Sequence, residues 1–339
     1  METRPLFILG AGFSKAITNG IMPLLNELTD DIVNVLKHSD QDDIYRYWKK
    51  YIEEPNIGNI RNATNHNFED IMTFLSSKFA YETYIDEHLK YILYQRVTEV
   101  IVEIFQRKNL EKEISHERYL IDFAHFLKHE KADIFTFNYD LVLEYLLAKV
   151  TNDELYHNHP STYFEKWYRI KKMPSYYNDN LEKYRTHTKN ILTIYKLHGS
   201  INWLYDKSSP TGIRVSSSFI PSEYAQGLDY LLVPPTMLKN FSFQTDLLNF
   251  QWQNFREKLK QAEKIYIIGY SIPQTDVATR YILQTHLNSS SEIFIVTLKP
   301  TIDIQDSWYN LFAEQDQKKK LHIIDDGFNK NAMKKMGII

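Results

Sequence analysis

The sequence predicts an α/β protein with a doubly wound, mostly parallel sheet and large helical insertions. Three observations carry this prediction. A short apolar run at residues 6–9 leads directly into a turn with Gly10 and Gly12, where the backbone is free to reverse tightly. A continuous apolar run at residues 265–268 is typical of a parallel strand buried on both faces. From there to residue 324, strand and helix patterns alternate, which is the order of βαβ units.

The N-terminal part of the chain begins with the strand expected at Leu6–Leu9. A helical pattern follows from about residue 15 to residue 36, with an interruption over Gly20–Pro23 where we expect a loop over a ligand. From about residue 42 to residue 131, apolar residues recur three and four positions apart. Because a crossover between strands needs only about a dozen residues, this segment is expected to be a helical insertion that could cover a pocket.

The next α/β unit begins with an alternating strand at residues 132–137. Asn138 and Asp140 follow its end, and a helix through Leu147 comes after them. Residues from about 151 to 190 are polar, aromatic and rich in turn formers. We expect a second insertion there, irregular or helical.

The strand pattern returns at residues 191–197 and ends in His198. The remaining expected elements are strands at 203–205 and 231–233, a helix over 243–262, the strand at 265–268, a helix over 275–287, and strands at 293–298 and 321–324. The whole is a Rossmann-like arrangement, which we expect to form a single domain over residues 1–339.

The composition excludes several classes of protein. Of the 339 residues 43% are hydrophobic, and no apolar run approaches the length of about 18 residues that a membrane span needs. We therefore expect a soluble, cytoplasmic protein without an export segment or a membrane partner. The net charge of −3 gives no reason to expect direct nucleic-acid binding. The chain has no cysteine, which excludes disulfides and every thiolate metal site.

Polar side chains stand at the expected carboxyl ends of buried strands. Asn138 and Asp140 follow one strand, His198 follows the next, and Ser271 follows a third. In a doubly wound sheet these ends converge on one crevice, which the turn at residues 10–14 also borders. Taken singly, Asn138 and Ser271 are equally compatible with helix caps, and His198 with a turn histidine whose hydrogen bonds are satisfied. Their order in one chain favours a shared site.

These residues belong to five motifs that occur in the order of a known family. The motifs are Gly10-Ala11-Gly12-Phe13-Ser14, Gly20-Ile21-Met22-Pro23, Thr136-Phe137-Asn138-Tyr139-Asp140, His198-Gly199 and Gly269-Tyr270-Ser271. They resemble the sirtuin pattern GAG-x-S, G-I-P, T-x-N-x-D, HG and G-x-S. The resemblance spans about residues 6 to 300 and is far more specific than any one motif.

The departures from the sirtuin pattern are also informative. Sirtuin deacetylases carry a four-cysteine zinc module, which a chain without cysteine lacks, so we expect no zinc and no other metal. After Pro23 the chain continues Leu24-Leu25-Asn26 in place of their acidic-aromatic-arginine run, and Thr297 stands near the position of their late asparagine. With Lys196–Ser200 followed by Trp203, the pattern resembles the sirtuin-like NADases of prokaryotic antiviral defence, which deplete NAD+ in abortive infection.

The resemblance implies a role for each motif. NAD+ would be a substrate, held through its phosphates by residues 10–14. Asn138 would position the ribose and the attacking water, Asp140 would bind the nicotinamide carboxamide, and His198 would be the general base, as suits an imidazole near neutral pH. Gly269 and Ser271, in the last motif, would contact the remaining ribose or phosphate. We therefore expect an NAD+ glycohydrolase that releases nicotinamide and ADP-ribose through an oxocarbenium-like state.

Two alternatives remain open from the sequence: a zinc-free NAD-dependent protein deacylase, and a non-catalytic sensor of NAD+ or ADP-ribose. The chain contains no Walker-type ATPase motif, so the trigger is expected to come from elsewhere. By family resemblance, the candidates are a separately encoded HerA-type ATPase, an Argonaute-like protein, or assembly into a homo-oligomer. The helical segment at 42–131 and the tyrosine-rich segment at 151–190 are the expected contact surfaces.

Overall fold

The computed structural model describes residues 4–38, 46, 49, 68–78, 80–108, 114–115, 117–151, 192, 194–205, 213–215, 229–233, 246–273 and 276–339. The insertion expected at about 151–190 lies, after its first residue, outside these described residues. None of the described helices is both long and apolar enough to cross a membrane.

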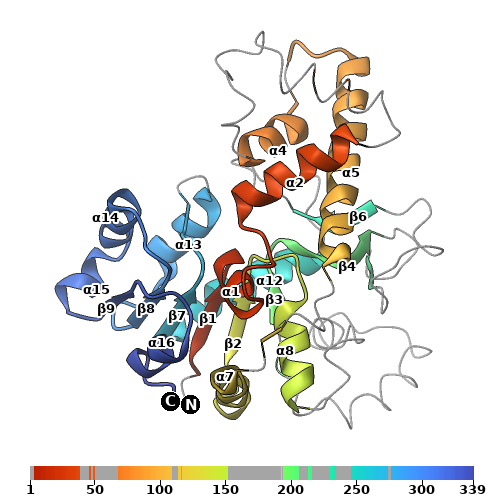
Figure 1. The fold of residues 1–339 in the computed structure, drawn as a ribbon. Coiled ribbons are helices and arrows are strands. Elements are labelled where there is room, and N and C mark those ends of the chain that lie inside the picture. Colours follow the sequence, from red (N-terminus) through yellow and green to blue (C-terminus); the bar gives the residue numbers. More distant parts are fainter. Residues whose placement is uncertain are drawn as a thin grey trace, which may run out of the picture.

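A parallel sheet of six strands forms the centre of the protein (Figure 1). Its strands are β1 (Leu6–Leu9), β2 (Asp133–Thr136), β3 (Ile194–Lys196), β7 (Lys264–Ile268), β8 (Glu292–Val296) and β9 (Leu321–Ile324). Their order is β3-β2-β1-β7-β8-β9, and every neighbouring pair is parallel. The strand order reverses between β1 and β7, so the switch point of the sheet lies there. The predicted doubly wound fold is confirmed.

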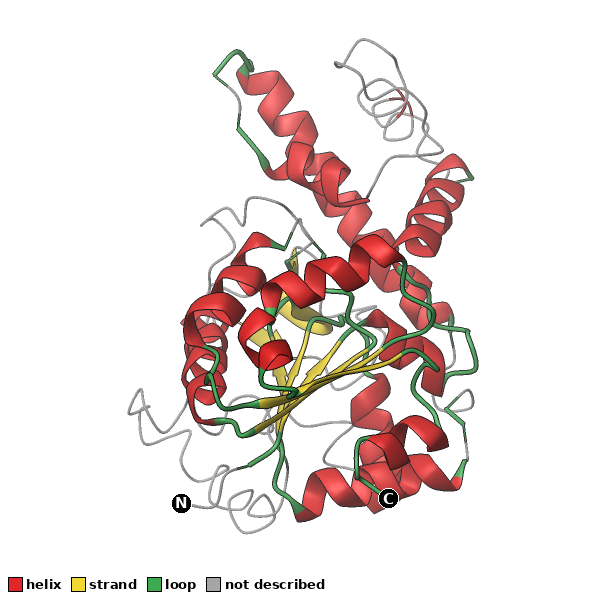
Figure 2. Cartoon of the chain, turned by 90° about the vertical axis from the view of Figure 1, so that its left-hand side faces the viewer, coloured by secondary structure: helices red, strands yellow, loops and turns green. Residues whose placement is uncertain are grey.

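Helices cover both faces of this sheet (Figure 2). One face carries α1 (Ala11–Ile17), α7 (Arg118–His129), α8 (Val142–Thr151) and α16 (Lys330–Lys335). The other carries α12 (Asp246–Gln261), α13 (Val277–His286), α14 (Ile302–Leu311) and α15 (Ala313–Gln317). Alternate residues of β1 enter the two cores, Phe7 and Leu9 on one side, Leu6 and Ile8 on the other. The strands are mostly apolar because helices cover both faces of the sheet.

A layer of helices rises beyond the sheet. It contains α2 (Leu25–Lys37) and a helical arm made of α4 (Phe68–Ser76) and α5 (Tyr84–Arg107), with α2 and α4 packed along α5 (Figure 1). The long helix α5 begins at a capping box, in which Thr83 Oγ1 accepts from the Asp86 N–H at 3.3 Å and Asp86 Oδ2 accepts from the Thr83 N–H at 3.0 Å. The described part of the segment 42–131 contains α4, α5 and α7, of which α7 packs on the sheet.

The structure differs from the expectation after β3. The strands β4 (Gly199–Tyr205), β5 (Ile213–Val215) and β6 (Asp229–Leu232) form a separate antiparallel sheet, in the order β5-β4-β6. The strand patterns at 203–205 and 231–233 therefore do not extend the parallel sheet. The reason is length: only Leu197 and His198 separate β3 from β4, whereas a parallel crossover needs about a dozen residues.

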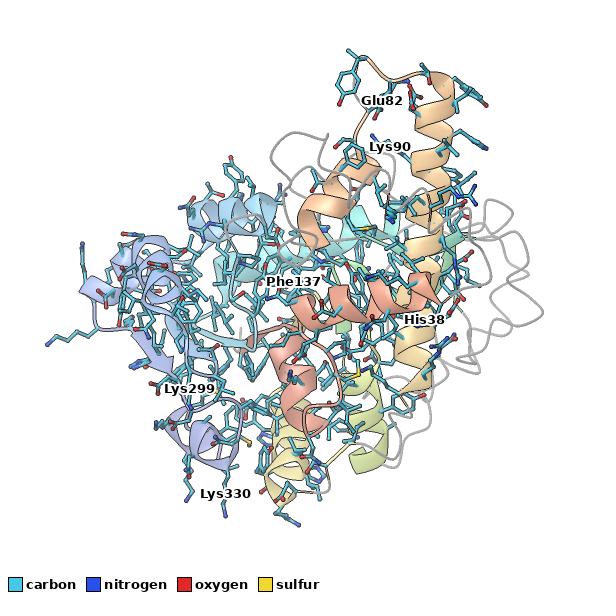
Figure 3. The ribbon with its side chains drawn as sticks, turned by 45° about the horizontal axis from the view of Figure 1, so that its top comes forward. His38, Glu82, Lys90, Phe137, Lys299 and Lys330 are labelled. Atoms are coloured by element: carbon cyan, nitrogen blue, oxygen red, sulfur yellow. The ribbon has the colours of Figure 1, made fainter. Side chains whose placement is uncertain are left out.

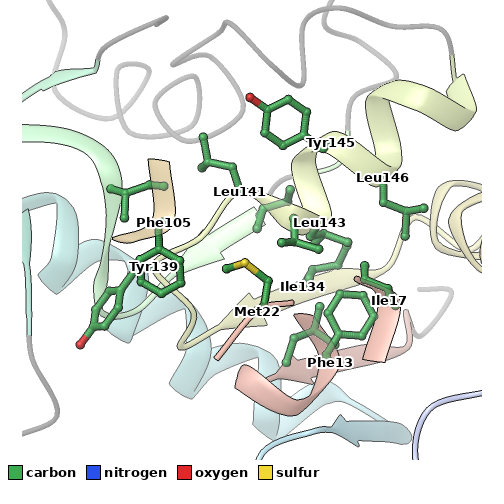
Figure 4. Close-up of a cluster of buried hydrophobic side chains, with 14 of the residues drawn as sticks. Phe13, Ile17, Met22, Phe105, Ile134, Tyr139, Leu141, Leu143, Tyr145 and Leu146 are labelled. Carbon is green, nitrogen blue, oxygen red and sulfur yellow. The ribbon is translucent and has the colours of Figure 1, made fainter. Parts of the chain in front are cut away.

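The interruption at Gly20–Pro23 is anchored in the core by Met22. Its side chain is buried, and its N–H donates to Thr18 Oγ1 at 3.2 Å. Figure 4 shows Met22 among apolar side chains that come from α1, from α5 through Phe105, and from the segment after β2 through Tyr139. The link between α1 and α2 is therefore packed against the turn that carries Asn138.

Candidate active site

The predicted glycine turn packs directly against the turn that follows β7. The Gly10 N–H donates to Ile268 O at 3.0 Å, and the Gly12 N–H donates to Gly269 O at 2.9 Å. A Cβ on Gly10 would lie 2.6 Å from Gly269 O, and a Cβ on Gly269, whose φ is +64°, would lie 2.0 Å from Phe13 N. These positions require glycine because two strand ends meet at the switch point without room for a side chain.

The same hydrogen bonds limit which backbone amides of residues 10–14 could bind a phosphate. The amides of Gly10, Gly12 and Phe13 all donate within the protein, the last to Gly10 O at 2.9 Å. Among the described residues, this leaves the amide of Ala11, the first residue of α1, without a backbone acceptor. The Phe13 ring is buried among aromatic side chains of the core, so Phe13 offers a ligand only its backbone.

A chain of hydrogen bonds joins the turn after β1 to the turn after β2. Asn138 Nδ2 donates to Gly10 O and to Ser14 Oγ, both at 2.9 Å. Ser14 Oγ donates in turn to Asp140 Oδ1 at 3.0 Å. Because a serine hydroxyl has one proton, accepting from Asn138 and donating to Asp140 defines the direction of the chain. The structure thus brings together residues separated by more than 120 positions in the sequence.

Asp140 is buried, and its carboxylate lies at the start of the next helix. Its Oδ1 accepts from the Val142 N–H at 3.0 Å, at the first residue of α8. The Asp140 carboxylate therefore satisfies the first amide of α8, and the capping alternative for Asn138 is wrong. Burial raises the pKa of the Asp140 carboxyl above its ordinary value, against the charge of Lys196 and the hydrogen bonds from Val142 and Ser14.

His198 lies in the turn between β3 and β4 and is buried. Its ring centroid is 5.0 Å from that of Phe137, in an edge-on arrangement, and 6.4 Å from that of Tyr139. Phe137 and Tyr139 are the two neighbours of Asn138 in sequence. The structure therefore sets His198 against the turn that carries Asn138, as the expected convergence of strand ends requires.

The turn after β7 contributes an aromatic ring from Tyr270. This ring stacks on Phe137 with centroids 4.4 Å apart, and its hydroxyl donates to Asp276 Oδ2 at 2.6 Å. Ser271 is exposed, and its carbonyl accepts from Trp308 Nε1 at 2.9 Å. The N-cap of α13 is Asp276, so the capping alternative for Ser271 is wrong.

Several residues of the site were not predicted from the sequence. Phe137 links His198 on one side to Tyr270 on the other, and the Trp252 ring lies 6.4 Å from the His198 ring. The signal for Phe137 was its place beside Asn138 at a strand end. Lys196 also had a signal, since a charged residue at the end of an apolar strand needs a buried partner. Nothing in the sequence pairs Trp252 with His198, because that contact is purely tertiary.

Within the described part of the chain, no group of three or more histidine, aspartate and glutamate side chains is arranged to hold a metal ion.

Comparisons with known proteins give a fold likeness. No protein-family model matches the chain, and no curated protein matches it. Among solved structures, this chain is similar to one from a study of the mechanism and regulation of Sir2 enzymes. The sequence identity is 12%, the match covers 99% of this chain and 92% of that chain, and the TM-score is 0.42. It is also similar to Sir2Tm bound to a propionylated peptide, with 11% identity, 100% and 95% covered, and a TM-score of 0.39. These values are too low to carry a functional argument.

Proposed function

We propose that this chain is an NAD+ hydrolase that cleaves the nicotinamide–ribose bond. The observation that carries the proposal is the hydrogen-bonded chain from Gly10 O through Asn138 and Ser14 to Asp140, next to the switch point of a doubly wound sheet. The order of the five sirtuin-like motifs in the sequence supports it. His198, set against the flanking residues of Asn138, supplies a group able to accept a proton near neutral pH.

The proposed reaction adds one water across the N-glycosidic bond. That bond breaks toward nicotinamide, which leaves as a neutral molecule, and the water oxygen bonds to the ribose carbon. The proton released from the water passes to His198 and then to solvent, so the products are nicotinamide, ADP-ribose and a proton. Asn138 would orient the ribose and the water, and Asp140 would bind the nicotinamide carboxamide.

The phosphates of NAD+ are assigned in this proposal to the turn after β1. Ala11 would supply an amide that no backbone hydrogen bond of the described residues occupies. Gly269 and Ser271 would border the remaining ribose or phosphate, with the Ser271 hydroxyl on the exposed side of its turn. NAD+ is a substrate here, and no metal takes part in the proposed step.

We extend the proposal to a role in antiphage defence, in which the activated enzyme depletes NAD+. Activation would come from a homo-oligomer or from a separately encoded partner such as a HerA-type ATPase or an Argonaute-like protein. Self-assembly predicts that activity per chain rises with protein concentration, which a dilution series combined with mass measurement in solution will detect.

The test is nicotinamide release from NAD+ by the purified chain over that concentration series. We expect release by the wild type and its loss in Asn138→Ala and in His198→Ala, whereas the exposed arm variant Lys78→Ala keeps it. Equal release by all four proteins would remove both residues from the mechanism. Product that appears only with an acyl-lysine peptide would identify a deacylase instead. Tight binding of NAD+ that stays intact at every concentration would identify a sensor.

A further inference from the structure

Lys196, the last residue of β3, is wholly buried beside the candidate site. Its side chain has an exposed fraction of 0%, and that of Glu144 on α8 has 4%. Lys196 Nζ lies 3.2 Å from Glu144 Oε1 and 3.4 Å from the Tyr139 carbonyl, and it also donates to the Asp140 carbonyl. A buried ammonium is very unfavourable unless it is paired and hydrogen-bonded, so these contacts account for its position.

The turn after β2 needs the donors that Lys196 supplies. Residues 137–141 belong to neither a helix nor a strand, yet four of the five are buried. Their carbonyls have no ladder partners and must find donors away from water. The Tyr139 carbonyl also accepts from the Ile201 N–H at 3.1 Å and from Ser200 Oγ at 3.3 Å. The Asp140 carbonyl accepts from Lys196 Nζ.

This turn is therefore held from two sides. Its side chains reach toward α1, through Asn138 to Gly10 O and Ser14 Oγ, and through Asp140 to Ser14 Oγ. Its carbonyls face the opposite way, toward the ammonium of Lys196. An ammonium carries three donors at one point, which suits it to join two successive carbonyls and a carboxylate.

We infer that Lys196, with Glu144 as its counter-charge, is a positioning residue that sets the orientation of Asn138 and Asp140 for the reaction. Lys196 touches no reacting atom in this scheme and acts through the backbone of residues 139 and 140. The inference rests on the proposed function, because it presumes that Asn138 acts on NAD+. Its backbone part, that Lys196 holds the turn, stands independently of the substrate.

A second buried lysine provides a matched control. Lys90 on α5 pairs with Glu82 at 2.6 Å, and the exposed fractions of their side chains are 3% and 5%. Lys90 also donates to the Ser77 carbonyl and lies 4.6 Å from the centre of the Phe74 ring. The pair has the same chemistry and similar burial to Lys196 and Glu144, but its contacts named here lie within the helical arm.

The experiment compares Lys196→Met, the double variant Lys196→Met/Glu144→Met, and Lys90→Met with the wild type. We expect Lys196→Met to lower kcat for nicotinamide release by about tenfold or more, with KM within about threefold, because a misplaced Asn138 affects the transition state more than binding. Lys90→Met should leave kcat per folded molecule unchanged. Both single variants should lower the melting temperature by about 5 °C, since each leaves a carboxylate buried and unpaired.

The double variant separates positioning from stability. Replacing both members of a buried ion pair with apolar residues of similar size restores stability, so its melting temperature should return toward the wild-type value. Its kcat should stay low, because the carbonyls of residues 139 and 140 still lack the ammonium. Recovery of kcat together with stability would overturn the inference and make Lys196 merely structural.

Hydrogen exchange gives a readout that does not depend on catalysis. The amides of Asn138 and Val142 donate to Thr136 Oγ1 at 3.1 Å and to Asp140 Oδ1 at 3.0 Å, so both report on the turn. Their exchange should be faster in Lys196→Met and in the double variant, and unchanged in Lys90→Met. Unchanged exchange in Lys196→Met would overturn the inference. A wild type that releases no nicotinamide would instead overturn the proposed function, and the exchange result would still decide whether Lys196 holds the turn.

Discussion

The carboxyl edge of the sheet and the helical arm each contain a buried lysine–glutamate pair, and the two pairs hold different parts of the backbone. At the sheet edge Lys196 meets Glu144, and in the arm Lys90 meets Glu82. Figure 3 shows Glu82 and Lys90 toward the outer end of α5, separated from Phe137 at the centre of the protein. In either place, removing one partner would leave an uncompensated charge away from water.

The difference lies in what else each ammonium holds. Lys90 joins α5 to α4 through the Phe74 ring and to the residue after α4 through the Ser77 carbonyl, so it attaches one helix to another. Lys196 joins a helix to an irregular turn whose side chains are the candidate reactive groups. A buried charge is therefore not in itself the mark of a site. The backbone that the charge supports decides whether its loss affects chemistry or only stability.

The largest expected difference between the two regions concerns catalysis. His198→Ala and Asn138→Ala should each lower nicotinamide release by about 10²- to 10⁴-fold, because they remove a proton acceptor and a group that orients the reactants. Steady-state kinetics on protein of verified fold will measure this. A loss of similar size in an exposed arm variant such as Lys78→Ala would mean that the arm, not the sheet edge, holds the reactive groups.

The close packing of the sheet edge gives the next largest effect. Gly269→Ala should lower the free energy of unfolding by about 3 kcal/mol or more, because its Cβ would meet Phe13 N at 2.0 Å with φ at +64°. Gly20, in the link to α2, also has a positive φ of +89° but nothing within 4 Å of an added Cβ. Gly20→Ala should therefore cost only about 1–2 kcal/mol of backbone strain. Equal midpoints of the two variants in urea would contradict this account.

A smaller, pH-dependent difference is expected at Asp140. Burial raises its folded-state pKa, so the folded protein binds a proton more tightly than the unfolded chain. Below the ordinary pKa of 3.8, this group increases the free energy of unfolding. That contribution is lost as pH rises through the raised folded-state pKa. Asp140→Asn keeps an acceptor for Ser14 and Val142 without the charge. Its stability relative to the wild type should therefore rise with pH across this window.

Urea unfolding of both proteins at a series of pH values measures that difference. A stability difference that stays constant with pH, or that falls as pH rises, would show that burial does not raise the folded-state pKa of Asp140.

The smallest effect is expected on the surface of the arm. Lys78 lies 2.8 Å from Glu87, but the exposed fraction of its side chain is 75%. Lys78→Ala should change the free energy of unfolding by less than about 0.5 kcal/mol, because solvent screens such a pair. A larger loss, measured at low and at high salt, would indicate that this ion pair belongs to a network that anchors the arm.

Much of the main sheet could be predicted because its strands are buried on both faces. Residues 6–9 and 265–268 are unbroken apolar runs, and each coincides with a strand of the structure to within a residue. The antiparallel sheet was harder to predict, since Trp203 and Leu231 have the same apolar character as strands of the main sheet. Only the short distance from β3 to β4 excludes a parallel crossover between them.

The sequence by itself determined the doubly wound fold and which strand ends carry Asn138, Asp140, His198 and Ser271, because apolar periodicity and turn residues are local properties of the chain. The tertiary structure alone decided the contacts among them. The donations from Asn138 to Ser14 and from Ser14 to Asp140, and the pairing of buried Lys196 with Glu144, all join segments that are distant in sequence. The hydrogen-bond partner of a buried polar group is the one that the fold places within reach, and a pattern along the sequence does not identify it.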